Sequence, residues 1–295
     1  MKILEALNWG EAQLKTTANE KAYDVHNQKL DSQVLLSYCL SKPTGYLFTH
    51  FEDPLSEKIL EKFERCIERR MRHEPIAYII GRKSFYRRDF YVNPFVLIPR
   101  PETEQLIDLV KRAATERSTI IDVGTGSGAI AITLAAELNH PVVAIDIDQN
   151  SLAVAKHNAE THQVSNLISL LHGNLLQPYL QKNVDESTTS SETLIVANLP
   201  YAPLKQWEGL DPDVKKYEPK KAVTGGVDGL DLFDELLQQI STYRHRFPEK
   251  LTLFMEMDSS HELMLPRLVK EHFPKAGIEV LRDLASKPRV TIAQL

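Results

Sequence analysis

The sequence predicts an α/β protein in which a seven-stranded, mostly parallel sheet follows a small helical domain. Residues 1 to about 75 show apolar side chains at helical spacing and lack the alternation of a strand. Short apolar runs typical of buried strands then alternate with helical stretches between residues 119 and 257. Such βαβ units build a parallel sheet, and two runs at 277–282 and 289–295 complete it as an antiparallel pair.

These patterns divide the chain into a helical domain (1–75), a β-hairpin linker (76–98) and a sheet domain (99–295). Within the linker, short β-rich runs at 84–86 and 90–92 flank a charged turn. The prolines of Pro99-Arg100-Pro101 then fix an extended entry before a helix that ends near Ala114. This entry is either a plain helix start or one wall of a site.

The third helical run of the first domain, after Pro54, has a basic face. Glutamates on the same run balance it, so the face is either a solvated surface or a patch that selects a partner. The basic residues are Lys62, Arg65, Arg69, Arg70 and Arg72.

A glycine-rich loop, Gly124-Thr125-Gly126-Ser127-Gly128, separates the strand 119–123 from the helix 129–138. Glycine permits a tight turn with positive φ and lets a ligand approach the backbone. The loop opens onto a helix N-terminus, whose free N–H groups favour an anionic group. Asp146 ends the next strand, 22 residues after Gly124, where a carboxylate can accept hydrogen bonds from both hydroxyls of a ribose.

This Rossmann-like loop also fits G-x-G-x-x-A, the pattern of nicotinamide- and flavin-binding sites. A further alternative is a glycine-rich turn that binds no ligand. Asp122 and the third glycine, Gly128, favour S-adenosyl-L-methionine. A carboxylate at Asp122 can meet the cationic end of the methionine moiety, whereas it would repel a pyrophosphate.

Two further segments follow the third strand of the sheet domain. Asn174 can bond the exocyclic amine of an adenine and Leu175 can pack on its face, although a plain turn asparagine is the alternative. The stretch Lys182 to Glu192 is polar and of low complexity, and we expect an exposed mobile loop there.

The strand 194–197 delivers Asn198-Leu199-Pro200-Tyr201 at its carboxyl end, where ligands bind in open α/β sheets. The Asn198 side-chain oxygen and a backbone carbonyl can accept both hydrogens of an –NH2 group. Pro200 stiffens the turn and Tyr201 can stack on a planar substrate. The alternative is an ordinary turn, and the site hypothesis requires this corner and the glycine loop to lie close together.

Composition limits the remaining function classes. A net charge of −5 argues against nonspecific binding to a phosphate backbone, and we expect no nucleic acid or membrane partner. The two cysteines lack metal-ligand spacing and none of the ten histidines forms an H-E-x-x-H motif, so we expect no metal. With no signal peptide or long apolar run, a cytoplasmic monomer is the simplest expectation.

The sequence resembles the HemK/PrmC family of protein-(glutamine-N5) methyltransferases, which act on peptide chain release factors. The resemblance covers nearly the whole chain. Besides the glycine loop and Asn198 to Tyr201, the stretches that carry it are 75–81, 97–104, 217–219 and 225–230.

This resemblance implies a class I methyltransferase domain, S-adenosyl-L-methionine as cofactor, and the glutamine of a release factor's Gly-Gly-Gln motif as substrate. Gly124 to Gly128, Asp146, Asn174, Leu175 and Asn198 would line the cofactor, and Asn198 to Tyr201 the glutamine.

The chain departs from the family's usual pattern at three positions. The family usually has Pro in place of Leu199, Asp in place of Asn174, and often an aromatic residue in place of Leu175. Asn198 to Tyr201 is also similar to the motif of rRNA adenine dimethyltransferases. An adenine-N6 methyltransferase acting on RNA or DNA is therefore the alternative function.

Overall fold

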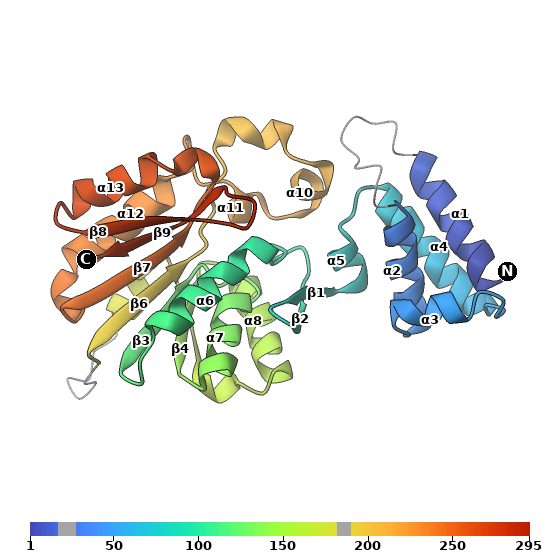
Figure 1. The fold of residues 1–295 in the computed structure, drawn as a ribbon, viewed down its shortest axis with the longest axis horizontal. Coiled ribbons are helices and arrows are strands. Elements are labelled where there is room, and N and C mark those ends of the chain that lie inside the picture. Colours follow the sequence, from blue (N-terminus) through green and yellow to red (C-terminus); the bar gives the residue numbers. More distant parts are fainter. Residues whose placement is uncertain (17–27, 182–189) are drawn as a thin grey trace. The chain divides into compact units, whose positions relative to one another are not determined.

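The computed structural model describes residues 1–16, 28–181 and 190–295, which form two compact units (Figure 1). Unit 1 comprises Met1–Arg82 and Gly209–Tyr217. Unit 2 comprises Lys83–Glu208 and Glu218–Leu295. Most of the predicted mobile loop lies outside the described residues, but Glu192 itself starts a strand, so that strand is longer than expected.

Unit 1 is helical, as predicted. Ser56 caps α4 by accepting a hydrogen bond from the Ile59 N–H at 3.4 Å. A β-carbon on Gly10 would lie 2.6 Å from the Ser32 hydroxyl oxygen, so α1 and α2 pack closely there. The helices are α1 (Ile3–Thr16), α2 (Gln28–Leu40), α3 (Thr44–Thr49), α4 (Glu57–Met71), α5 (Ile76–Ile80) and α10 (Pro212–Tyr217).

The basic face expected on α4 is only partly solvated. Arg70 is buried, with its guanidinium 2.7 Å from Asp31 and 2.6 Å from Asp213. Arg70 was therefore wrongly placed on an open surface by helical spacing alone. Its ion pair with Asp213 joins the segment 209–217, which comes from far along the sequence, to α4 within unit 1.

The predicted hairpin is present as β1 (Arg82–Phe85) and β2 (Arg88–Tyr91), but with shifted bounds. Tyr86, expected in a strand, lies in the turn, whereas Arg88 and Asp89, expected in the turn, lie in β2. Tyr86 and Arg87 connect the strands, with φ of 46° and 61°. Positive φ at both residues of a two-residue turn matches the right-handed twist of the two flanking strands.

Unit 2 is built on the predicted seven-stranded sheet, whose order is β5-β4-β3-β6-β7-β9-β8. The first five strands in this order are parallel, whereas β9 runs antiparallel to both β7 and β8. The bounds are β3 (Ser118–Val123), β4 (Val142–Asp146), β5 (Ile168–His172), β6 (Glu192–Ala197), β7 (Lys250–Glu256), β8 (Gly277–Arg282) and β9 (Pro288–Gln294).

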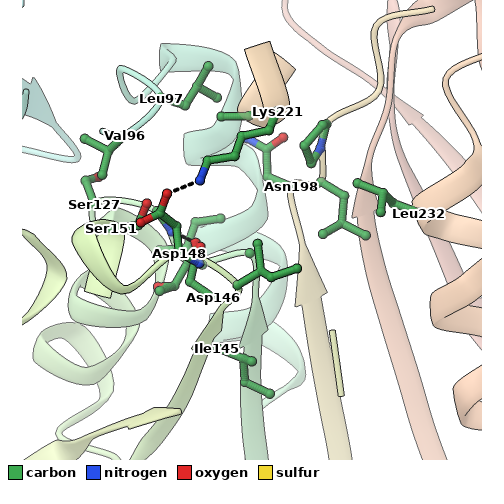
Figure 2. Close-up of a pocket in the computed structure, with 18 of the residues that line it drawn as sticks. Val96, Leu97, Ser127, Ile145, Asp146, Asp148, Ser151, Asn198, Lys221 and Leu232 are labelled. Atoms are coloured by element: carbon green, nitrogen blue, oxygen red, sulfur yellow. Dashed lines mark hydrogen bonds and ion pairs between the residues drawn. The ribbon is translucent and has the colours of Figure 1, made fainter. Parts of the chain in front are cut away.

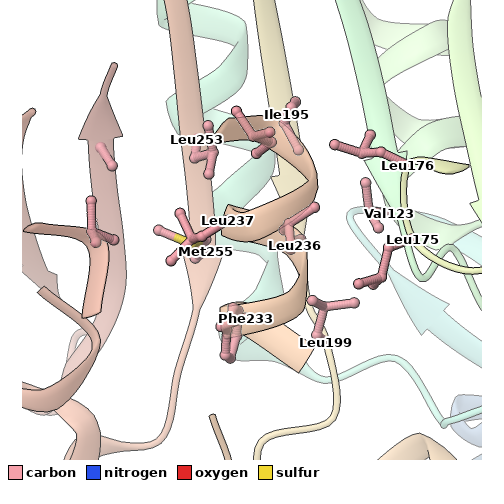
Figure 3. Packing of buried hydrophobic residues seen from close by; sticks show 14 of the residues in the cluster. Val123, Leu175, Leu176, Ile195, Leu199, Phe233, Leu236, Leu237, Leu253 and Met255 are labelled. Carbon is pink, nitrogen blue, oxygen red and sulfur yellow. The ribbon is translucent and has the colours of Figure 1, made fainter. Parts of the chain in front are cut away.

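Helices cover both faces of this sheet, because successive strand residues point to opposite faces. On β3, Ile121 and Val123 pack with α12 (Asp231–Thr242) and α13 (Met264–His272). Ile120 faces the opposite cluster, which contains side chains of α6 (Glu104–Ala113), α7 (Ala129–Leu138) and α8 (Gln149–Thr161). Figure 3 shows Ile195, Leu253 and Met255 beside Phe233, Leu236 and Leu237 of α12.

Short helical turns link the main elements of unit 2. They are η1 (Pro101–Thr103), η2 (Ser165–Leu167), α9 (Gln177–Leu180), η3 (Leu204–Gly209), α11 (Lys220–Val223), η4 (Arg244–Arg246) and η5 (Ser259–His261).

The strand order reverses at the centre of the sheet. From β3 the chain proceeds to β4 and β5 on one side, and then crosses to β6 on the other side of β3. Loops that leave β3 and β6 therefore diverge above a crevice at their carboxyl ends, where open α/β sheets bind ligands.

Candidate active site

A cavity of about 520 Å³ lies in unit 2 at the carboxyl ends of β3 to β6 (Figure 2). Its size is typical of a small-molecule site. Among the residues that line it are the predicted site residues Gly124, Thr125, Gly126, Ser127, Asp146, Asn174, Leu175, Asn198, Leu199 and Pro200.

The glycine loop has the conformation that its sequence predicts. Gly124, Gly126 and Gly128 have φ of +77°, +54° and +80°. The N–H groups of Gly124 and Thr125 both donate to the Ile145 carbonyl at 2.9 Å, which fixes the loop to β4. Gly128 does not line the cavity; a β-carbon there would lie 2.6 Å from Ile132 Cδ1, so this glycine serves the start of α7.

Asp122 lies beneath the glycine loop. It is fully buried, and its Oδ2 accepts hydrogen bonds from the Thr125 hydroxyl at 2.7 Å and the Ala131 N–H at 3.2 Å. Burial raises its pKa to about 7. The expectation that this carboxylate meets a cationic ligand is wrong, because Asp122 is not part of the cavity wall.

Asp146 joins the loop to the cavity. Its Oδ2 accepts from the Gly126 N–H at 2.8 Å and its Oδ1 from the Asp148 N–H at 2.9 Å. Burial raises its pKa, while these two N–H groups work in the opposite direction. Each carboxylate oxygen keeps a lone pair for a ligand hydroxyl.

Lys221 and Asp148 both line the cavity and form an ion pair there, as Figure 2 shows. Hydrogen bonding to Lys221 lowers the pKa of Asp148. Neither residue was singled out from the sequence, because they lie 73 positions apart.

Asn174 and Leu175 follow β5. Leu175 is buried with φ of 50° and packs beside Val123 and Leu199 (Figure 3). Asn174 donates a hydrogen bond through Nδ2 to Glu235 Oε1, so its Oδ1 remains as an acceptor. Glu235 sits on α12 one turn before Gln239, which donates to the same oxygen at 3.3 Å.

At the end of β6, Asn198 lines the cavity and is half-buried. Its Nδ2 donates to the Thr103 hydroxyl oxygen at 3.0 Å. Tyr201 is not part of the cavity wall; its hydroxyl donates to Glu256 Oε1 at 3.3 Å, and burial raises its pKa. The structure therefore does not support the predicted stacking role of Tyr201.

The backbone of this turn is packed against two glycines. A β-carbon on Gly225 would lie 2.2 Å from the Pro200 carbonyl oxygen. One on Gly229 would lie 2.1 Å from the Tyr201 carbonyl oxygen. The conformation after Asn198 thus depends on glycine at both positions.

The segment before η1 forms another part of the wall. Val96, Leu97, Pro99 and Arg100 line the cavity. Buried Glu218 holds this segment, because it accepts from the Ile98 N–H at 3.2 Å and pairs with the Arg100 guanidinium. The segment is therefore both a helix entry and a cavity wall.

The two predicted corners are in contact. A β-carbon on Gly124 would lie 3.0 Å from Leu199 Cδ2. The glycine loop and the turn after β6 thus border one cavity, as the site hypothesis required.

Known proteins resemble the chain along its whole length. Residues 5–81 match the PrmC N-terminal domain family, and residues 100–220 match the family of ribosomal protein L11 methyltransferase (PrmA). A release factor glutamine methyltransferase of Bacillus cereus is 33% identical over 100% of both chains. The chain belongs to the release factor glutamine methyltransferase family.

Other members of this family are similarly related. The protein of that name from Bacillus subtilis is 32% identical over 99% of this chain and 97% of its own. The one from Geobacter sulfurreducens is 37% identical over 71% of this chain and 70% of its own. The expected family is therefore confirmed.

Solved structures support the fold. The catalytic domain of hMettl16 in complex with MAT2A 3'UTR hairpin 6 aligns with a TM-score of 0.51 and 18% identity, covering 69% of this chain and 74% of that chain. A human methyltransferase 10 domain containing protein aligns with a TM-score of 0.50 and 17% identity, covering 70% of this chain and 87% of that chain. Unit 2 has the methyltransferase fold.

The described part of the chain contains neither a candidate metal site nor a helix that could span a membrane. In the ranges 1–16, 28–181 and 190–295, His, Cys, Asp and Glu side chains do not form a group that can hold a metal ion. No helix in these same ranges is long and apolar enough to cross a membrane.

Proposed function

We propose that this protein transfers a methyl group from S-adenosyl-L-methionine to the side-chain nitrogen of the glutamine in a release factor's Gly-Gly-Gln motif. Family membership supports the substrate class. The observation that carries the chemistry is the Asn198 amide, whose Nδ2 is held by Thr103 while the residue lines the same cavity as the glycine loop.

The residues of the cavity fit this cofactor. Asp146 offers carboxylate oxygens for the ribose hydroxyls, and Asn174 Oδ1 is an acceptor for the adenine amine. Ile147, 61% exposed, and buried Leu175 supply apolar contacts for the adenine ring. The cofactor can approach the backbone of the loop closely at Gly126, because the space around a β-carbon there is empty to 4 Å.

When bound, the cofactor's sulfonium supplies an electrophilic methyl group. An amide nitrogen is a poor nucleophile because its lone pair is delocalised into the carbonyl. The protein must therefore orient the amide and stabilise the positive charge that develops on its nitrogen.

Asn198 meets both requirements. Its Oδ1 and the Leu199 carbonyl accept the two hydrogens of the glutamine –NH2 group, so the nitrogen is aimed into the cavity. Accepting both hydrogens also stabilises the positive charge of the transition state. A well-fixed near-attack geometry contributes on the order of 7–11 kcal/mol, and the proton leaves to solvent after transfer.

Leu199 takes the place where the family usually has proline. Its side chain is buried with Leu175 and Phe233, and this packing restrains the turn that proline would otherwise stiffen. The backbone carbonyl required by the proposal is the same for either residue.

We assign release factor recognition to the helices of unit 1, of which residues 5–81 match the PrmC N-terminal domain family. Because the substrate is a translation factor, the proposed reaction takes place in the cytoplasm.

The test is methyl transfer from isotope-labelled S-adenosyl-L-methionine to a purified release factor, followed by peptide mass spectrometry. We expect one added methyl group on the Gly-Gly-Gln glutamine, and none on a release factor with Gly-Gly-Ala. Tritium transfer to RNA or DNA oligonucleotides, without transfer to the release factor, would establish the adenine-N6 alternative instead.

A further inference from the structure

We propose that Glu235 is a positioning residue through which the cavity selects a cofactor whose purine carries an amino group. This inference rests on the proposed binding of S-adenosyl-L-methionine, and it adds the residues that fix the Asn174 amide. Glu235 lies on α12 and is half-buried. It is not part of the cavity wall, whereas Asn174 is.

The two ends of the Asn174 side chain have opposite hydrogen-bonding character. Its Oδ1 accepts, whereas its Nδ2 donates, and the two ends have nearly the same shape. With Oδ1 toward the cavity, Asn174 can accept a hydrogen bond from the amino group of adenine. Rotated by 180°, it would present N–H groups to that amino group, and donor would face donor. The orientation of this amide therefore decides which purine the cavity accepts.

Glu235 fixes this orientation. Its Oε1 accepts a hydrogen bond from Asn174 Nδ2 and a second one, at 3.3 Å, from Gln239 Nε2. Because two N–H groups point at this one oxygen, it acts as an acceptor. A rotated Asn174 would place its Oδ1 against that acceptor and lose the hydrogen bond. Asn174 therefore turns Nδ2 to Glu235 and keeps Oδ1 for the cavity.

The backbone fixes Gln239 in turn. The Leu176 N–H donates to Gln239 Oε1 at 2.9 Å. A backbone N–H cannot accept, so Gln239, which is 8% exposed, turns its oxygen to Leu176 and its Nε2 to Glu235. Buried polar groups that are satisfied in only one arrangement in this way hold that arrangement.

A purine with an oxygen at C6 does not fit this arrangement. Hypoxanthine carries a carbonyl oxygen where adenine carries its amino group, so two acceptors would meet at Asn174 Oδ1. An acceptor that is taken out of water without a donor weakens binding. The cavity should therefore prefer the adenosyl compound over its inosyl analogue.

The test compares S-adenosyl-L-homocysteine with S-inosyl-L-homocysteine by calorimetry. For the wild type we expect the inosyl compound to bind on the order of 10- to 100-fold more weakly. In Glu235→Leu, Asn174 can rotate and donate to the C6 oxygen, so this ratio of Kd values should fall on the order of tenfold. Equal Kd values in the wild type, or the wild-type ratio in Glu235→Leu, would overturn the inference.

Two further variants should keep most of the wild-type ratio. In Glu235→Gln, the donor on Gln239 holds the side-chain oxygen of the new glutamine in place, so that oxygen still accepts from Asn174. In Asn174→Asp combined with Glu235→Leu, both carboxylate oxygens accept, and no neighbour is needed to orient them. If either variant shows a ratio as low as that of Glu235→Leu, the inference is overturned.

The ratio also separates positioning from stability, because both Kd values are measured on the same folded protein. Asp234→Asn, at a neighbouring position of α12 whose side chain is 55% exposed, is the control for a lost charge and should keep the wild-type ratio. If Glu235→Leu does not fold, Glu235→Ala takes its place. Wild-type protein that binds the adenosyl compound but leaves a release factor unmodified would refute the proposed substrate and not the selection of the purine.

Discussion

Asn174 donates its side-chain N–H to the Glu235 carboxylate, which joins the end of β5 to α12 beside the cavity. The family usually carries aspartate at position 174. Aspartate cannot donate this hydrogen bond, so an amide at position 174 suits the neighbouring Glu235 carboxylate.

Asn174→Asp should therefore destabilise this chain, although aspartate is the usual residue of the family. It places a second carboxylate against Glu235, and we expect a loss of unfolding free energy on the order of 1–3 kcal/mol. Urea unfolding at neutral pH measures this. Adding Glu235→Gln restores a donor and should recover most of the loss; a double variant as unstable as Asn174→Asp would contradict the pairing.

Gly225→Ala should impair methyl transfer. A β-carbon there would lie 2.2 Å from the Pro200 carbonyl oxygen, so the turn after Asn198 has to shift. Displacing reacting groups by about 1 Å can cost on the order of 100-fold in rate. Steady-state methylation of a release factor measures this effect.

Gly209→Ala is the control for Gly225→Ala, because a β-carbon at Gly209 would meet nothing within 4 Å. Equal rates for the two variants would show that close approach to Pro200 has no part in activity.

Much of the fold was predictable because buried strands and glycine loops leave local patterns. The helix at 129–138 and the strand at 277–282 have the bounds expected from the sequence. In contrast, α13 was not predicted, and its burial of Leu265 and Val269 follows from the sheet it covers. Similarly, the placement of 209–217 in unit 1 depends on ion pairs that no sequence pattern shows.

The candidate site shows the same division. The glycine loop, Asp146 and Asn198 stand directly after strands, so their common edge could be inferred. Thr103, Glu235 and Glu256 come from other parts of the chain, and only the fold brings them into hydrogen-bond contact with Asn198, Asn174 and Tyr201. Sequence spacing also placed Asp122 in the site, but its side chain points beneath the loop to Thr125.

Asn198→Ala should nearly abolish methylation while largely sparing cofactor affinity. The variant loses the acceptor proposed for the substrate amide, and losing one such preorganised group costs about 100- to 1,000-fold in kcat. Rates come from isotope transfer to a release factor, and affinity from calorimetry with S-adenosyl-L-methionine. Turnover equal to that of the wild type would rule out the assigned role.

Asp122 should make a contribution to the free energy of unfolding that falls as the pH rises from about 4 to about 7. Its pKa is raised by burial from 3.8 to about 7, so the folded state binds a proton that the unfolded state has released. This contribution is fully present below pH 4 and is lost as the pH rises through 7. At about 1.4 kcal/mol per pKa unit, it amounts to at most about 4 kcal/mol.

Urea unfolding across this pH range tests the role of Asp122. Because this contribution is absent from Asp122→Asn, its free energy of unfolding should increase relative to that of the wild type between pH 4 and pH 7. Burial also raises the pKa of Glu256 to about 7, so its contribution has the same sign, and the relative increase should be larger in Asp122→Asn with Glu256→Gln. The same change in the free energy of unfolding with pH in all three proteins would refute this account.

Arg70→Met should destabilise unit 1 far more than Arg69→Met, although the two arginines are adjacent on α4. The Arg70 side chain is 10% exposed and pairs with both Asp31 and Asp213, and its removal leaves two carboxylates without their common cation. Breaking a buried ion pair in this way costs about 3–5 kcal/mol. Arg69 is 44% exposed in its pair with Glu74, and such surface pairs contribute about 0–1 kcal/mol.

Urea unfolding followed by far-ultraviolet circular dichroism compares the two arginine variants. Combining Arg70→Met with Asp31→Asn and Asp213→Asn should recover most of the lost stability, because neutral amides then replace the two carboxylates that faced the guanidinium. If the triple variant is as unstable as Arg70→Met, the cost arises from lost packing of the arginine stem, and the ion pairs do not hold 209–217 to the helices.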